Sequence, residues 1–370
     1  MDQSATSEQW VPSHEACERL GIRPQTLYAY VSRGRLSRRI DRGRSFFDVR
    51  ELDRLAARTR RSGRAGRLEV LIDTEITLLD RRGALSYRGV DVPEIATAWS
   101  FERTAEWLWS GIDAEPPLWA APEPWLAVAR AVGGERPGDR LRTAAAALAG
   151  LADRDDRAVA PVGRALVPAL VEALPRLGRP ATAPGVAAQL WPRLTKLPAT
   201  PDRIRTLDAA LVLLADHEMA VSTVAARVAA SAWAAPIACV LAGLAAHSGA
   251  LHGGVSSTVV DALRRGDDVH SWSGHVVYEG QDPRSVALLA LLADTPATRA
   301  VARTPRPNID MVLAAMVIDF RMIDGAGEAI FAIARVVGWL AHAAEEYERP
   351  FRFRPRARYV GPPPLRRPLP

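Results

Sequence analysis

Hydrophobic and polar positions divide the chain into parts of different character. Between residues 92 and 347, stretches rich in Ala, Leu, Val and Trp alternate with breaks that contain Pro or Gly, and this pattern predicts a succession of α-helices. No regular alternation of strands and helices occurs, so a parallel sheet is not expected. Residues 69–89 combine short β-prone pieces with a turn at Asp80–Gly83. The pattern therefore predicts an all-α body that begins with a small β element.

The first 60 residues predict a separate helical module. Apolar positions spaced for helices occur in residues 13–20 and 24–33, and a glycine follows each segment as a helix stop. A basic hairpin is expected at 38–47 and a third helix at 48–57. The order of helix, glycine-containing turn, helix and hairpin resembles the winged helix-turn-helix DNA-binding domain of MerR-type regulators.

Charge separates this module from the rest of the chain. Residues 1–67 hold 15 Arg and 8 acidic residues, a net charge of +7, whereas the remainder holds 33 basic and 34 acidic residues, a net charge of −1. Such asymmetry points to a polyanion-binding module beside a neutral body. A basic helical module that docks on a protein is the alternative to DNA binding through residues 10–58. The residues that the resemblance places on DNA are Gln25, Thr26, Tyr28, Arg33 and Arg35.

The cysteines and the N-terminal residues indicate the cellular compartment in which the protein is expected. Cys17 and Cys239 lie far apart in helical contexts and indicate no disulfide framework. The N-terminal residues lack the basic and apolar regions of a signal peptide, and no stretch is long and uncharged enough to span a bilayer. We therefore expect a cytoplasmic protein without membrane association.

Histidines, a carboxylate and arginines recur in short motifs along the body. After Leu85-Ser-Tyr-Arg-Gly-Val-Asp, they follow in this order: Ala-Asp-His217-Glu, Ala-Leu-His252-Gly-Gly, Gly-His275-Val-Val-Tyr-Glu-Gly-Gln-Asp-Pro-Arg284, Pro-Asn-Ile-Asp310, Phe-Ala-Ile-Ala-Arg335-Val-Val-Gly-Trp and Arg354-Pro-Arg-Ala-Arg-Tyr-Val-Gly-Pro. In content and order these motifs resemble those of bacterial-type citrate synthases, and the match extends over about residues 69–363.

The resemblance implies an all-α homodimer in which a large and a small helical domain close over the substrates. The reaction that it implies condenses acetyl-CoA, or a related acyl-CoA, with oxaloacetate to give citrate and CoA. The expected divisions are a helix-turn-helix domain at 1–60, a linker at 61–68 and a citrate-synthase-like domain at 69–370, with a small subdomain at roughly 222–330 and a C-terminal arm at 350–370.

The chemistry needs a base for a weakly acidic methyl proton, and a carboxylate in a water-poor site suits this task. By resemblance that base is Asp310, while His252 stabilises the developing enol oxygen and His275 polarises the ketone of oxaloacetate. Arginines bind a dicarboxylate well because each guanidinium can make two parallel hydrogen bonds. The expected oxaloacetate ligands are His217, Arg284, Arg335 and, from the partner subunit in the resemblance, Arg354. No metal or other cofactor is expected, and acetyl-CoA is a substrate.

Each of these residues also has a structural interpretation. Lone histidines in Ala-rich helices are more often core or capping residues, and His247 and His342, which match no motif, are expected to be structural. Asp310 could cap a helix that begins at Met311, since Asp is a favoured N-cap. Arg335 has only apolar neighbours in sequence and would need a partner if it faced a core.

Departures from the family pattern gather in the segment expected to bind the CoA moiety. Family members usually have Pro-Gly-Phe-Gly-His-Arg-Val-Tyr-Lys here, whereas this chain has Ser271-Trp-Ser-Gly-His-Val-Val-Tyr-Glu279. Trp272 therefore stands at a usual Gly, and Val276 and Glu279 stand at two usually basic positions. Leu214 also stands where the family usually has His, and Ala220 stands where it commonly has Asn. Two hypotheses follow. One is a citrate-synthase-type enzyme; the alternative is a DNA-binding transcriptional regulator whose body senses a dicarboxylate or acyl-CoA. The retained acid, base and arginines favour the enzyme.

Overall fold

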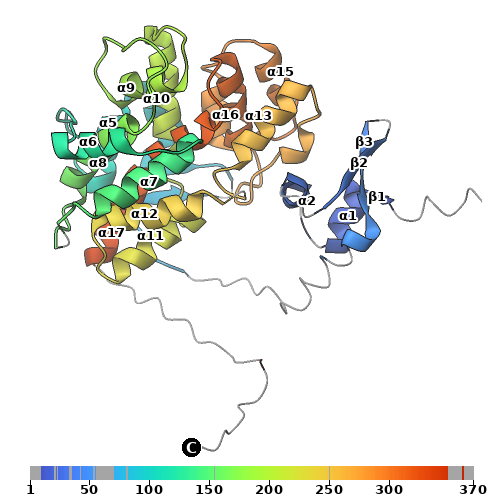
Figure 1. The fold of residues 1–370 in the computed structure, drawn as a ribbon, viewed down its shortest axis with the longest axis horizontal. Helices are drawn as coiled ribbons and strands as arrows, with labels where there is room; N and C mark the ends of the chain where they lie inside the picture. The colour runs from blue at the N-terminus through green and yellow to red at the C-terminus, as the bar shows by residue number, and fades with distance from the viewer. Residues whose placement is uncertain are drawn as a thin grey trace, which may run out of the picture.

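A computed structural model describes residues 10–20, 22, 24–32, 36–41, 43–52, 55, 71–80, 82–153, 155–249, 251–348 and 361 (Figure 1). The expected linker at 61–68 lies outside these residues, as does the expected arm at 350–370 except for residue 361. Three predicted site residues also lie outside them: Arg33, Arg35 and Arg354.

The described residues 10–55, here called the head, combine helices with a small sheet. Its elements are β1 (Trp10–Pro12), α1 (Ser13–Leu20), α2 (Pro24–Ser32), β2 (Arg38–Asp41) and β3 (Arg44–Asp48), and residues 49–52 and 55 are helical. The antiparallel strand order is β1-β3-β2, with Val11 opposite Phe47. Phe47 and Leu27 are fully buried in a separate small core. The first two predicted helices and the hairpin are present, and the described part of the third predicted helix, at 48–57, is helical at 49–52 and 55. The additional strand β1 was not predicted.

The predicted β element at the start of the body is confirmed. Strands β4 (Thr77–Leu79), β5 (Leu85–Tyr87) and β6 (Val90–Asp91) form an antiparallel sheet in that order. The turn between β4 and β5 is closed by the Gly83 N–H, which donates to the Asp80 carbonyl oxygen at 2.9 Å. Gly83 has a φ of +108°, a conformation that glycine adopts without steric cost. The sheet brings the fully buried Tyr87 against the helical core.

The rest of the body is helical, as predicted. Its helices are α4 (Val92–Ala98), α5 (Phe101–Ser110), α6 (Glu123–Ala131), α7 (Pro137–Ala149), α8 (Val159–Glu172), α9 (Val186–Leu194), α10 (Pro201–Leu214), α11 (Val221–Ser231), α12 (Pro236–His247), α13 (Val255–Arg265), the 3-10 helix η1 (His270–Trp272), α14 (Pro283–Leu289), α15 (Pro296–Ala302), α16 (Ile309–Asp319) and α17 (Ala326–Glu348).

Helix α17 forms the centre of the body and contacts α5, α7, α8, α10, α11 and α12. Most of its residues are buried, Arg335 and His342 included, which is typical of a helix surrounded by protein. Among the described residues it is the one helix long and apolar enough to cross a membrane by length and composition, whereas no such stretch was expected from the sequence. Because 94% of its apolar window is buried inside the fold, its composition fits a core helix.

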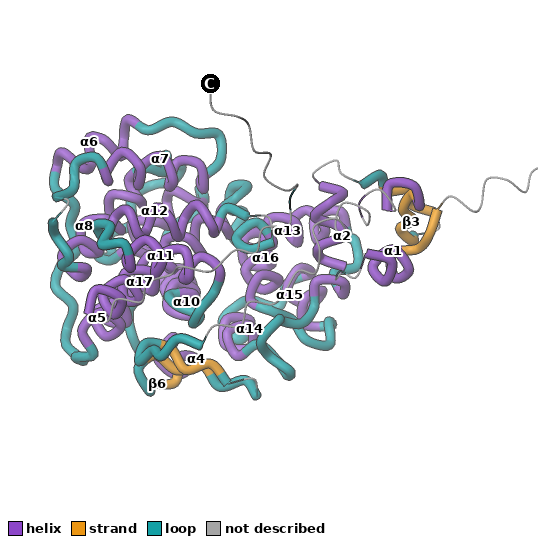
Figure 2. The backbone as a smooth tube through the Cα atoms, turned by 90° about the horizontal axis from the view of Figure 1, so that it is seen from below, coloured by secondary structure: helices purple, strands orange, loops and turns teal. Residues whose placement is uncertain are grey.

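Helices α13–α16 lie side by side at the edge of the body that faces the head (Figure 2). Within this group α16 packs against α13, α14 and α15. In Figures 1 and 2 α2 is the head element nearest to them, and it contacts η1. The head therefore approaches the body at the group of helices that carries Arg284 and Asp310.

Candidate active site

His217 lies in the turn that follows α10, and Tyr87 holds this turn in place. The Asp216 N–H donates to the Tyr87 hydroxyl at 3.0 Å, and that hydroxyl is in turn 3.0 Å from the Asp216 carbonyl oxygen. The His217 Nε2 lies 2.9 Å from the Tyr278 hydroxyl, and its ring centre is 5.0 Å from that of His275. Burial, together with the charge of Arg284, lowers the pKa of His217 well below its ordinary value. His217 is therefore a neutral imidazole.

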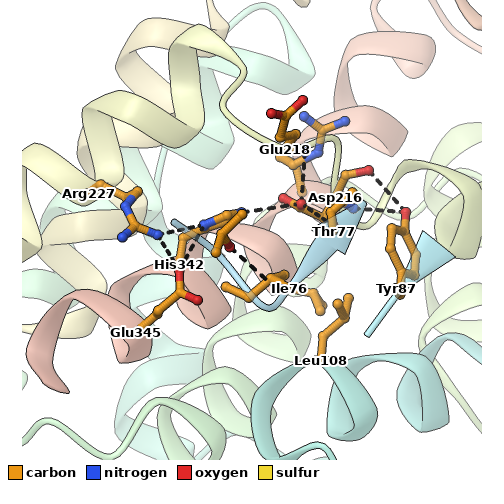
Figure 3. Close-up of polar contacts among 12 residues, drawn as sticks. Ile76, Thr77, Tyr87, Leu108, Asp216, Glu218, Arg227, His342 and Glu345 are labelled. Atoms are coloured by element: carbon orange, nitrogen blue, oxygen red, sulfur yellow. Dashed lines mark hydrogen bonds and ion pairs between the residues drawn. The ribbon is translucent and has the colours of Figure 1, made fainter. Parts of the chain in front are cut away.

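A buried polar network supports this turn from behind (Figure 3). The Asp216 Oδ2 accepts a hydrogen bond of 2.6 Å from the Thr77 hydroxyl and lies 3.2 Å from His342 Nε2. Arg227 Nη1 lies 3.0 Å from His342 Nδ1. Since a guanidinium can only donate, Nδ1 accepts, and Nε2 is the ring nitrogen that donates to Asp216. Arg227 is also paired with Glu345.

His252 lies in the loop before α13. Its Nε2 is 2.8 Å from the hydroxyl of Ser222, a fully buried residue of α11. Burial and the nearby Arg335 lower the pKa of His252 to about 4. The ring is therefore neutral near pH 7, with one edge held by Ser222.

His275 follows η1, and its tautomer can be deduced. The Val277 N–H donates to His275 Nδ1 at 3.2 Å. In the neutral ring the proton then sits on Nε2, which can donate a hydrogen bond.

Asp310 is in the first turn of α16, and it is not the helix cap. The helix begins at Ile309, and Asn308 is the N-cap, since its side chain accepts from the Met311 N–H at 3.1 Å. The capping interpretation of Asp310 is therefore wrong. Its Oδ1 is buried without a hydrogen-bond partner among the described residues, and burial raises its pKa to about 6. A carboxylate with a buried oxygen that has no hydrogen-bond partner is suited to accept a proton.

Arg284, in the first turn of α14, is held by Asp282. Its Nε and Nη2 donate to the two oxygens of Asp282 at 3.0 and 2.8 Å, and both side chains are buried. Asp282 Oδ2 also accepts from the Ile309 N–H at 3.1 Å. One carboxylate thus fixes Arg284 to the beginning of the helix that carries Asp310.

Arg335 lies in the middle of α17 and has the polar partner that its apolar surroundings require. Its Nε donates to the Leu214 carbonyl oxygen at 2.8 Å, and its guanidinium lies 4.7 Å from the centre of the Phe331 ring. Nη1 and Nη2 are buried and have no hydrogen-bond partner among the described residues. Leaving both NH2 groups of a cation unsatisfied is costly, so this geometry favours an anionic ligand.

A cavity of about 350 Å³ brings these groups together. Its lining includes six of the seven predicted catalytic and substrate-binding residues: His217, His252, His275, Arg284, Asp310 and Arg335. The arrangement combines one base, neutral imidazoles that can donate hydrogen bonds, and guanidinium groups for an anion. Within the described ranges no group of three or more His, Cys, Asp or Glu residues is placed to hold a metal ion.

Several contributors were not assigned a role from the sequence. Tyr278 and Asp282 lie within a quoted motif, and their position between His275 and Arg284 was the available signal. Asn308 likewise lies within the quoted motif Pro-Asn-Ile-Asp310, whereas Ser222 carried no such signal. Gln25, which was predicted to contact DNA, also lines the cavity. His247 and His342 do not line it, in agreement with their expected structural roles.

Comparison with known sequences agrees with the geometry. The family described as "Citrate synthase, C-terminal domain" matches residues 68–356. Citrate synthase of Haloferax volcanii is 33% identical over 190 residues, which cover 42% of this chain and 50% of that protein. Citrate synthase 2 of Bacillus subtilis is 28% identical over 237 residues, or 54% of this chain and 64% of that protein. These sequence matches thus span about half to two-thirds of each relative's length.

Solved structures extend the likeness of the fold. Citrate synthase from Thermotoga maritima matches with a TM-score of 0.65 and 24% identity over 80% of this chain and 95% of that chain. Citrate synthase from Thermoplasma acidophilum matches with a TM-score of 0.62 and 22% identity over 81% and 96%. At such identities the likeness concerns the fold, and the family assignment rests on the match over residues 68–356. This chain belongs to the citrate synthase family.

Proposed function

We propose that the protein condenses an acyl-CoA, acetyl-CoA in the simplest case, with oxaloacetate to give citrate and CoA. The observation that carries this proposal is the single cavity in which Asp310, His252 and His275 meet the unsatisfied guanidinium of Arg335. The Thermoplasma acidophilum structure is described as a ternary complex with carboxymethyl coenzyme A and oxaloacetate, which supports the same pair of ligands here.

In the proposed reaction, Asp310 removes a proton from the methyl carbon of the thioester. His252, oriented by Ser222, donates a hydrogen bond to the oxygen of the resulting enol. His275 donates from Nε2 to the ketone oxygen of oxaloacetate, so that the ketone carbon accepts the new carbon–carbon bond and its oxygen takes a proton. Water then cleaves the thioester, which releases citrate and the CoA thiol.

Oxaloacetate would be held by His217, Arg284 and Arg335. Arg335 has two donors available for a carboxylate, whereas two nitrogens of Arg284 are already bound to Asp282. Their joint positive charge, in a site shielded from water, favours the dianion.

Further parts of the proposal rest on the family resemblance. They are a homodimer in which Arg354 completes the partner's site, a small subdomain at roughly 222–330 that closes over the substrates, and a cytoplasmic location. DNA contact by the MerR-like head also stays a prediction. The comparisons give no support to the regulator alternative, and Gln25 and Tyr28, two of the predicted DNA contacts, touch Trp272 of the body.

The test is release of the CoA thiol on mixing the protein with oxaloacetate and a panel of acyl-CoAs. We expect oxaloacetate-dependent release with at least one donor. Asp310→Asn, which keeps the side chain's size but cannot act as a base, should abolish release and leave oxaloacetate binding by calorimetry within about threefold of the parent. Absence of release with every donor would refute the proposed function.

A further inference from the structure

Helix α2 of the head contacts the body at Trp272, next to the candidate active site. Gln25 Nε2 donates to the Trp272 carbonyl oxygen at 3.2 Å. The Tyr28 and Trp272 rings pack with centres 5.7 Å apart at an interplanar angle of 30°. Trp272 is 7% exposed, so this contact seals the ring between the head and the body.

The same carbonyl group links the head to the helix of the proposed base. Asn308 Nδ2 donates to the Trp272 carbonyl oxygen at 2.7 Å and to the Gly274 carbonyl oxygen at 2.9 Å. Asn308 is also the N-cap of α16, two residues before Asp310. Gln25 of α2 and Asn308 at the start of α16 therefore donate to the same carbonyl oxygen. These two contacts hold the segment that leads to His275 between the head and α16.

The space between α2 and the body continues the active-site cavity. A second cavity of about 190 Å³ is lined by Gln25, Thr26 and Ala29 of the head. It shares four lining residues with the cavity of the catalytic groups: Gln25, Leu251, Val255 and Val276. Leu251 and Val276 are 59% and 69% exposed, so the cleft between the two cavities has aliphatic side chains open to a ligand.

We propose that α2 forms one wall of the passage through which the acyl donor reaches Asp310, and that Gln25 and Thr26 contribute to recognition of the donor. This inference rests on the proposed function. The arm of an acyl-CoA alternates short hydrocarbon segments with amides. Leu251, Val255 and Val276 offer apolar contact to such an arm, and the carboxamide of Gln25 offers hydrogen bonding. The head lies outside residues 68–356, which the family model matches, so this wall of the site would be an addition to the part of the chain shared with the family.

Obstruction of this passage tests the inference. Thr26 is half-buried and lines the outer cavity, so Thr26→Trp should place a ring in the path of the donor arm. We expect the KM for acetyl-CoA to rise roughly tenfold to a hundredfold, as for overpacking of a filled space. The short thioester S-acetyl-N-acetylcysteamine reaches Asp310 without filling the passage, so its kcat/KM should change by less than about threefold. Oxaloacetate affinity should be unchanged.

Ile40→Trp is the matched control, because Ile40 lies on β2 of the head, is 60% exposed and lines neither cavity. It should leave both donors unaffected. Equal loss with the two donors, or no change in the KM for acetyl-CoA, would overturn the inference. Should the parent protein release no thiol, the proposed function fails separately. In that case the affinity for CoA is measured by calorimetry in the presence of oxaloacetate, for the parent and for Thr26→Trp. Equal affinity in the two proteins overturns the inference.

Discussion

Asp216 and His342 are joined by a 3.2 Å contact between the carboxylate Oδ2 and the imidazole Nε2, and both side chains are completely buried (Figure 3). Burial alone would raise the pKa of Asp216. The interactions with His342, Arg335 and Thr77 outweigh burial and hold that pKa below its ordinary value. A charged carboxylate is thus kept directly behind His217 and beside Arg335, the two residues proposed to bind oxaloacetate.

Replacing this charge should damage both stability and binding. Asp216→Asn presents an amide to donors that need an acceptor and leaves Arg335 without a balancing charge. We expect a loss of about 3–5 kcal/mol in the free energy of unfolding, as for other broken buried pairs, measured by urea denaturation. Oxaloacetate affinity should fall as well. Asp113→Asn is the control, since its ion pair with Arg103 is exposed to solvent and should contribute little to the free energy of unfolding. Equal stability of the two variants would contradict this role for Asp216.

The raised pKa of Asp310 predicts the pH dependence of catalysis. The base acts as a carboxylate, so kcat/KM should fall below about pH 6, tenfold per pH unit, and level off above it. His252, with a pKa of about 4, stays neutral over this range and should add no second limb above pH 5. The measurement is kcat/KM for the acyl donor between pH 5 and 8. A kcat/KM that stays constant between pH 5 and 8 would mean that Asp310 has an ordinary environment.

The helical body could be predicted from the hydrophobic pattern. Six residues of the cavity could be predicted because they occur in short motifs whose order along the chain resembles that of the family. The sequence could not show that Asn308 rather than Asp310 caps α16, since both are good N-caps and only the backbone conformation distinguishes them. Nor could it show the contact between Gln25 and Trp272, which are 247 positions apart. Pairings at such separation depend on packing and leave no periodic signal in the chain. By length and composition α17 could also cross a membrane, and its burial within the body is what marks it as a core helix.

A second carboxylate, away from the active site, should make stability depend on pH. Burial, and then the charge of Glu102, raise the pKa of Asp208 in α10 to about 7. Because this folded-state pKa exceeds the ordinary carboxyl value, the folded state loses stability as pH rises from about 4 to about 7. Asp208→Asn should therefore raise the free energy of unfolding by about 1–3 kcal/mol at pH 8, and the gain should shrink toward pH 4. Urea denaturation of parent and variant at both pH values tests this, and a gain independent of pH would contradict it.

The close approach of α17 to the His217 turn gives a last prediction. A Cβ at Gly338 would lie 2.3 Å from Asp216 Oδ1 and 2.5 Å from the Ala215 carbonyl oxygen, and real Cβ atoms do not come this close. The Gly338 N–H also donates to that carbonyl oxygen at 3.0 Å. Gly338→Ala should therefore push the turn away from α17.

The expected result is a loss of about 1–3 kcal/mol in unfolding free energy, despite the gain of up to about 1 kcal/mol that Ala brings to a helix interior. Because the turn carries His217, the KM for oxaloacetate should rise more than the KM for the acyl donor. Gly133→Ala is the control, since a Cβ there meets nothing within 4 Å. If Gly338→Ala matches this control in urea denaturation and binds oxaloacetate as the parent does, the turn tolerates displacement, and the packing of α17 does not set the position of His217.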